Sequence, residues 1–206
     1  MPLAAVPASP ATALRCAVAV AIALVAGCAP VDRQPTLIYP PATASDTRAA
    51  APKNKQIILN PFLDHRADRT NIGMVGSAFG LRETEVVPTN DVAEWVISGV
   101  KTELEKDGYF VTLGSSGTDT LPGAIAAVSG VIVDVSCKTG HSAKVEVIGK
   151  VNQAGKEVLN KKYSAQGSAK SPLAPTAQAC AQSLTVALAA SVKSFVAELD
   201  GILATR

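Results

Sequence analysis

Two segments of the chain carry apolar residues at helical spacing. Within residues 91–107 the apolar positions repeat every four residues, and within residues 176–204 they repeat every three or four. Such spacing places apolar side chains along one stripe of an α-helix. The stripes consist of Val92, Val96, Val100 and Leu104 in the first segment and of Leu184, Leu188, Val192, Phe195, Leu199 and Ile202 in the second.

Local signals support both predicted helices. Asp91, with Glu94 three residues later, resembles an N-terminal capping box, and Gly108 supplies the left-handed residue that commonly follows a helix. Pro175 precedes the second segment, where Thr176 is a favourable N-cap. We therefore expect one helix at each of the two segments.

Alternating apolar and polar residues predict strands between the helices. Residues 131–137 carry Val, Val, Val and Cys at odd positions, and residues 143–151 carry small or apolar residues there, with charged residues between them. Period two is typical of a sheet with one face in water. A turn at 152–155 leads to a third strand at about 157–166, which predicts an antiparallel meander.

Shorter apolar runs complete the predicted fold. Residues 57–63, interrupted by Pro61, suit an edge strand or a bulged strand, and residues 109–113 suit a further strand. Residues 64–89 read as a long loop with one or two short strands. The order strand, helix, strand, three strands, helix predicts an α+β fold: a two-layer sandwich with two helices on one face of a mostly antiparallel sheet. Residues 55–206 are expected to form this single domain.

The N-terminal 27 residues predict a lipoprotein signal peptide. An apolar run covers residues 16–26, and eleven residues make about 16 Å of helix, half of a ~30 Å hydrocarbon core. The run ends in Leu24-Val-Ala-Gly-Cys28, where small residues precede a cysteine as in a bacterial lipobox. We expect cleavage before Cys28 and lipid, including palmitate, on its thiol; the alternative is an ordinary signal peptide.

Residues 28–54 are rich in Pro, Ala, Thr and Ser and predict a lipidated tether. Within it, residues 36–39 are the one candidate for an edge strand lying on the domain. Without Arg15, the chain from residue 28 has 18 basic and 17 acidic side chains, a net charge of about +1. The basic residues are not clustered, so the sequence does not indicate a nucleic-acid-binding protein.

Cys137 and Cys180 are the cysteines that remain after the signal peptide and the anchor. In an oxidising compartment such a pair favours a disulfide; the alternative is two buried thiols. Cys137 also lies four residues before His141, which makes the pair the best candidate for a nucleophile and base. The opposing interpretation is a strand end followed by an exposed histidine. His65 and His141 lack partners at metal-ligand spacing, so we expect no metal and no cofactor.

Two other features are candidates for a partner surface. Asp64, Arg66 and Asp68 follow an apolar strand, where loops on a rigid scaffold often carry function. Their alternative role is an internal ion pair, such as Asp64 with Arg66 or Arg69, that fixes the loop. Trp95, the only tryptophan, lies at the edge of its helical stripe and is either a core residue or an interface anchor.

These motifs together resemble a known family. The lipobox, the Asp64-x-Arg66-x-Asp68 loop followed by Ile72-Gly73, the helix end Leu104-Glu-Lys-Asp-Gly108-Tyr and the meander with its terminal helix look like the YajG family of proteobacterial outer-membrane lipoproteins. The glycine-rich segment 73–81 departs from that pattern. Ala29 stands where an aspartate would follow the cysteine, and the resemblance to lipoproteins sorted by the Lol system implies the outer membrane, facing the periplasm.

The sequence therefore predicts a non-enzymatic, lipid-anchored envelope lipoprotein that binds another envelope protein or lipid. An alternative is an auxiliary lipoprotein of a transport or lipopolysaccharide-handling complex, which a continuous apolar groove between sheet and helix would favour. A second alternative is a periplasmic hydrolase that uses Cys137 and His141.

Overall fold

The computed structural model describes residues 33–41, 53–76, 83–138, 142–169 and 176–204. Five strands form the main sheet, in the order β4-β1-β5-β6-β7. They are β1 (Gln56–Asp64), β4 (Phe110–Leu113), β5 (Ala124–Lys138), β6 (Ser142–Gln153) and β7 (Lys156–Ser168). The three long strands β5, β6 and β7 are antiparallel, as the meander pattern predicts, whereas β1 runs parallel to both β4 and β5.

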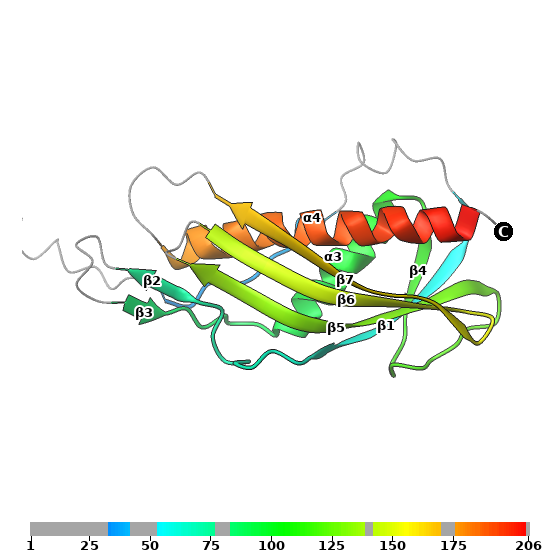
Figure 1. The fold of residues 1–206 in the computed structure, drawn as a ribbon, viewed down its shortest axis with the longest axis horizontal. Coiled ribbons are helices and arrows are strands. Elements are labelled where there is room, and N and C mark those ends of the chain that lie inside the picture. Colours follow the sequence, from blue (N-terminus) through cyan, green and yellow to red (C-terminus); the bar gives the residue numbers. More distant parts are fainter. Residues whose placement is uncertain (1–32, 42–52, 77–82, 139–141, 170–175, 205–206) are drawn as a thin grey trace, which may run out of the picture. The chain divides into compact units, whose positions relative to one another are not determined.

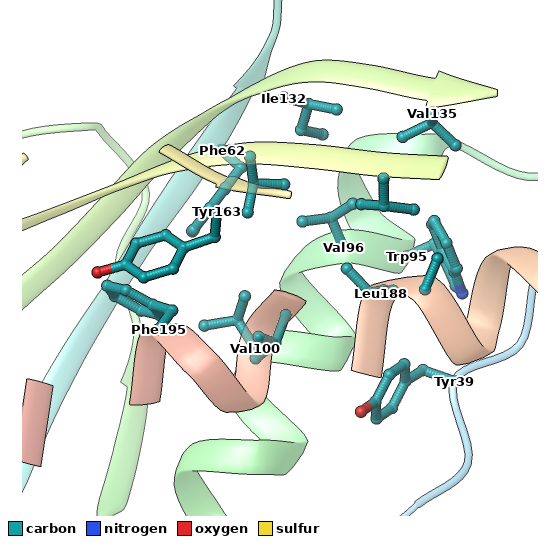
Figure 2. Packing of buried hydrophobic residues seen from close by; sticks show 14 of the residues in the cluster. Tyr39, Phe62, Trp95, Val96, Val100, Ile132, Val135, Tyr163, Leu188 and Phe195 are labelled. Carbon is teal, nitrogen blue, oxygen red and sulfur yellow. The ribbon is translucent and has the colours of Figure 1, made fainter. Parts of the chain in front are cut away.

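Two helices, α3 (Val92–Lys106) and α4 (Ala177–Ala204), pack on the sheet and on each other (Figure 1). Helix α3 contacts β1 and β4, and α4 contacts β5, β6 and β7. Their buried side chains belong to one apolar core, part of which is seen in Figure 2. The predicted α+β fold, with a mostly antiparallel sheet and two helices, is confirmed.

The predicted helix signals act as expected. The Asp91 carboxylate accepts hydrogen bonds from the backbone N–H groups of Ala93 (2.6 Å) and Glu94 (3.0 Å), which satisfies two donors that the first turn leaves open. At the other end of α3, Gly108 has φ of +90°, the left-handed conformation that glycine adopts without strain.

The strand β5 departs from its predicted pattern in one place. Val135 and Cys137 are buried as expected, but Ile132 is fully buried where the sequence places Val131 and Val133 on the core side. The register with β6 shifts between Ile132 and Asp134, which marks a β-bulge. The bulge adds one residue and so reverses which positions face the core.

The first strand also differs from one of its two predictions. β1 lies between β4 and β5, so it is a central strand and the edge-strand interpretation is wrong. Its register with β5 shifts between Leu59 and Phe62, on either side of Pro61. A bulge accommodates proline in a sheet interior because the missing N–H then breaks no regular ladder bond.

The long loop carries a small hairpin, as expected, made of β2 (Met74–Gly76) and β3 (Glu83–Glu85). The loop is bound to the end of β5, because the Cys137 N–H donates to the Ile72 carbonyl (2.8 Å) and Gly73 forms a bridge with Cys137. A side chain at Gly73 would meet the Cys137 carbonyl oxygen at 2.2 Å, so only glycine fits this approach.

Residues 33–41, which the sequence assigns to the tether, lie on the folded domain. Pro35, Leu37 and Tyr39 are buried while Thr36, Ile38 and Pro40 are exposed, so one side of this extended segment faces the core. The segment is held on the domain mostly by isolated hydrogen bonds to residues 87–90. These bonds do not form a regular ladder, so the segment is not a strand. The apolar residues 36–39 thus lie on the domain as expected, although not as an edge strand.

Candidate functional site

The charged loop after β1 is built around the buried guanidinium of Arg66. This side chain is 4% exposed, and its Nε and Nη2 atoms donate to the Asp64 carboxylate at 3.0 and 2.9 Å. Its remaining donors reach the backbone carbonyls of Asn71 (3.1 Å) and Arg69 (3.0 Å). Burial favours a higher pKa for Asp64, but the hydrogen bonds and charge of Arg66 hold that pKa below its usual range.

Asp68 performs a second, local task in the same loop. Its carboxylate accepts hydrogen bonds from the Thr70 N–H and hydroxyl (2.8 and 2.7 Å) and from the Asn71 side chain (2.5 Å). The hydrogen bonds from the Thr70 hydroxyl and N–H, and one from the Asn71 N–H, lower the pKa of Asp68. Since the polar groups of Asp64, Arg66 and Asp68 are used within the loop, the contacts fit the structural interpretation rather than a partner surface.

Trp95 belongs to the core. It is 2% exposed and lies among the buried side chains near Leu188 (Figure 2). Its Nε1 atom has no hydrogen-bond partner among the described residues. The proposal that Trp95 is part of a partner surface is therefore corrected: the helix turns this ring toward α4, and an interface anchor must be accessible.

Cys137 and Cys180 are brought together as two buried thiols. They are 3% and 0% exposed, at the end of β5 and in the first turns of α4. Their side chains hydrogen-bond to each other, and that bond and burial raise the pKa of Cys180. The expected disulfide is not formed in this structure, although the two residues are neighbours as that prediction requires.

The hydrolase alternative gains no support from this arrangement. His141 lies outside the described residues, and Cys137 is buried with its backbone bonded to the loop at Ile72. A nucleophilic thiolate needs an accessible site and a lowered pKa, whereas burial in apolar surroundings favours the thiol.

Cys28, the expected lipidation site, also lies outside the described residues.

A polar cluster that the sequence patterns did not predict joins the ends of both helices. Lys53 Nζ lies 2.5 Å from a carboxylate oxygen of Asp107, just after α3, and 2.5 Å from one of Asp200, on α4. The Tyr109 hydroxyl donates to the other Asp200 oxygen, and the Lys53 ammonium lies 4.3 Å from the centre of the Tyr109 ring. These residues lie up to 147 positions apart, so no local pattern could reveal the cluster.

The two carboxyl groups of this cluster have different environments. Burial raises the pKa of Asp107, and the adjacent Asp200 raises it further. Burial also acts on Asp200, but the bonds from Lys53 and Tyr109 outweigh it and keep the pKa of Asp200 low. The arrangement keeps Asp200 ionised beside the Lys53 ammonium, as expected for an ion pair that joins the ends of the helices.

A groove of about 520 Å³ opens beside the cluster, lined by Glu103, Lys106, Asp107, Lys193, Val196, Ala197 and Asp200. Within it, Glu103 is 6% exposed and accepts hydrogen bonds from the Tyr39 hydroxyl (2.8 Å) and the Lys106 ammonium (2.9 Å). Because Glu103, Asp107 and Asp200 already have partners within the protein, the groove presents no unsatisfied charge of theirs to a ligand.

The described residues do not include a metal site of the usual composition. Among them, no group of three or more His, Cys, Asp and Glu side chains is placed to hold a metal ion. The helices of the same residues include none that is both long and apolar enough to cross a membrane. Neither result identifies an activity.

The fold defines the class of protein: a small α+β domain with two helices packed on a five-stranded sheet. Protein XCC0632 from Xanthomonas campestris, which carries the family name DUF330, shares this fold with a TM-score of 0.52, 13% identity and coverage of 84% of this chain and 97% of that one. A second crystal structure, of an uncharacterized protein, has a TM-score of 0.53 and 8% identity, and covers 72% of this chain and 94% of that one.

A comparison of the sequence with protein families assigns the chain to one family within this fold class. The family model described as "uncharacterized lipoprotein" matches residues 53–199, and the chain belongs to this lipoprotein family. The resemblance to YajG-like lipoproteins is thereby confirmed. A search of curated proteins found no match.

Proposed function

We propose that this protein is cut before Cys28, anchored by lipid on that cysteine to the outer membrane, and works in the periplasm as a non-enzymatic binding module. Membership of a lipoprotein family is the observation that carries the proposal, together with the small residues that precede Cys28. Ala29, in place of aspartate, supports the outer membrane over the inner membrane.

The contacts of the candidate chemical groups support binding over catalysis. Arg66 and the two thiols are buried, and Glu103, Asp107 and Asp200 are paired within the protein. A catalytic group must be able to reach a substrate. A binding module requires only exposed side chains on a rigid scaffold, with another envelope protein or lipid as its partner.

The transport or lipopolysaccharide-handling alternative has less support. An apolar notch of about 420 Å³ lies between α3 and the strands β1 and β4, lined by residues that include Leu59, Ile97 and Leu113. The notch lies between sheet and helix, as this alternative requires, but its lining on α3 extends only from Glu94 to Lys101, about two turns, so it is not a continuous groove along the sheet. The binding-module proposal therefore stands first.

The anchor is tested by Cys28→Ser. We expect this variant to lose incorporation of radiolabelled palmitate and to leave the membrane fraction, because the acyl chains on Cys28 provide the membrane affinity. Cys180→Ser is the matched control and should keep both. Unchanged membrane attachment of Cys28→Ser would rule out the lipid anchor.

The partner is tested separately, by cross-linked capture of the wild-type protein from envelopes.

A further inference from the structure

The segment 33–41 is held on the domain by specific contacts. The Leu37 N–H donates to the Asn90 side-chain oxygen (2.9 Å), and the Asn90 amide donates back to the Leu37 carbonyl (3.0 Å). Leu37 is 3% exposed, so its side chain belongs to the core. The ring of Tyr39 packs against Gly99 of α3, where an added Cβ would lie 3.0 Å from it.

The start of this segment lies beside the small hairpin. The Val87 N–H donates to the Arg33 carbonyl (3.2 Å), and the Thr89 N–H donates to the Pro35 carbonyl (3.1 Å). Arg33 and Gln34 line one groove with Glu83, Thr84, Glu85 and Val87, in and just after β3. The position of Arg33 on the domain is thus fixed by backbone bonds rather than by a flexible tether.

This docking shortens the length of chain available to an anchor at Cys28. Arg33 lies only five positions after Cys28, and five extended residues span at most about 18 Å. If the chain were free up to Lys53, its 25 residues would reach about 85 Å when extended and about 28 Å on average as a flexible coil.

We propose that the end of the domain formed by Arg33, β2 and β3 faces the bilayer, and that the lipid surface is its partner. This inference rests on the proposed lipid anchor at Cys28 and adds the orientation of the anchored domain. The short chain keeps Arg33, and with it this end of the domain, within about 18 Å of the anchor.

The side chains at this end suit a lipid surface. Met74 on β2 and Val87 after β3 are 38% and 36% exposed, and the Val87 N–H donates to the carbonyl of the exposed Arg33. Apolar side chains enter the acyl boundary of a bilayer, and a guanidinium binds lipid phosphate. Glu83 and Glu85, also exposed, limit the attraction to anionic lipid. Contact at this end therefore depends mainly on the anchor.

The opposite end of the domain then faces the periplasm. It holds the turn between β6 and β7 and the end of α4, while β2, β3 and the start of α4 lie at the anchored end (Figure 1). With 28 residues, α4 alone spans about 42 Å. The cluster of Lys53, Asp107, Tyr109 and Asp200 and the groove beside it would thus lie on the side available to a soluble partner.

Energy transfer from tryptophan tests this orientation. The full-length lipidated protein is placed in phosphatidylethanolamine–phosphatidylglycerol vesicles that contain a dansyl-labelled headgroup lipid. Trp95, the only tryptophan, follows Asn90 by five residues and so reports on the anchored end. The double variant Trp95→Phe/Lys156→Trp moves the donor to the exposed turn at the far end. We expect Trp95 to transfer at least about twice as efficiently as the tryptophan at position 156.

Two further variants separate the short anchor chain from other causes. Inserting 20 Gly/Ser residues after Pro30 lengthens the chain without altering the described fold, and should lower transfer from Trp95 by about half. Leu37→Asp should have the same effect by releasing the segment, whereas Ile38→Asp, at a position 67% exposed, adds the same charge and should change nothing. Circular dichroism checks that each variant is folded.

The outcomes distinguish the two proposals. If Cys28 carries no lipid, the proposed function fails and the orientation fails with it. If Cys28 carries lipid but Trp95 and the tryptophan at position 156 transfer equally, only the orientation is overturned. Transfer that is unaffected by the inserted chain, while the protein stays on the vesicles, also overturns the orientation.

Discussion

Arg66 shows how a charged loop residue becomes part of the structure. A guanidinium that is 4% exposed must be paired, because an isolated buried charge costs several kcal/mol. Here Asp64 and two backbone carbonyls supply the acceptors. The same few residues therefore fix the path of the chain from β1 toward the hairpin.

We expect Arg66→Ala to lower the free energy of unfolding by about 2–4 kcal/mol, because it leaves Asp64 half-buried and unpaired. The exposed Arg69→Ala is the control and should change stability by less than about 0.5 kcal/mol. Urea denaturation monitored by Trp95 fluorescence measures both. If Arg66→Ala were as stable as the wild type yet lost a partner, the loop would be a binding site instead.

The stability that the Asp64–Arg66 ion pair contributes should depend on pH in a defined direction. The pKa of Asp64 is lower in the folded protein than in the unfolded chain, where it is about 3.9. Its contribution to stability is therefore complete above the unfolded pKa and is lost as pH falls through the folded pKa. The stability difference between wild type and Arg66→Ala should shrink in urea titrations as pH falls below about 4. A difference that stays constant down to pH ~2 contradicts this.

At the scale of elements, glycines set how closely α4 approaches the sheet. A Cβ at Gly149 on β6 would lie 2.6 Å from the Phe195 ring, and one at Gly167 on β7 would lie 2.1 Å from the Ser183 carbonyl oxygen. Without side chains at these two points, Phe195 and the backbone of α4 fill the space directly above the strands. The long helix and the meander are therefore matched in shape as well as in hydrophobicity.

Gly149→Ala should destabilise the fold by about 1–3 kcal/mol, because Phe195 must shift within a packed core. Gly201→Ala makes the same change near the end of α4, where the new Cβ meets nothing within 4 Å beyond its chain neighbours and the adjacent backbone of its own helix. It should stabilise the protein by about 0.5 kcal/mol through the higher helix propensity of alanine. Thermal unfolding compares the two variants. Equal effects would mean that the contact with Phe195 does not limit the packing.

At the scale of the whole molecule, contacts between distant parts of the chain join its layers. Tyr39 reaches Glu103 of α3, Lys53 reaches Asp200 of α4, and Cys137 of β5 hydrogen-bonds to Cys180 of α4. Each contact links segments more than 40 residues apart. Such long-range contacts must form together with the core, so we expect the domain to unfold in one cooperative step.

The two buried thiols lead to a prediction about the protein in its own compartment. Their proximity should allow a disulfide to form under oxidising conditions, closing a loop of about 43 residues and adding up to about 4 kcal/mol by the chain-entropy model. Thiol titration of denatured, unreduced protein from envelopes should then find neither thiol. Two thiols per chain would show that the pair stays reduced, and Cys180→Ser provides the one-thiol control.

The sequence alone located most of the helices and strands of this protein and indicated its family. Apolar spacing located α3, α4 and the meander, because each pattern follows from the geometry of a single helix or strand. The lipobox and the motifs at Asp64 and Gly108 were sufficient to indicate the lipoprotein family. These features are local, so they can be read without knowing what lies beside them.

Only the tertiary structure decided how these elements are used. The bulge after Ile132, the central place of β1 and the docking of residues 33–41 all depend on partners distant in the chain. The pairing of Lys53 with Asp200 is of the same kind. Likewise, Trp95 could have faced either the core or a partner until the packing of α3 on α4 placed it. Burial and charge pairing are properties of the assembled core, which local patterns cannot determine.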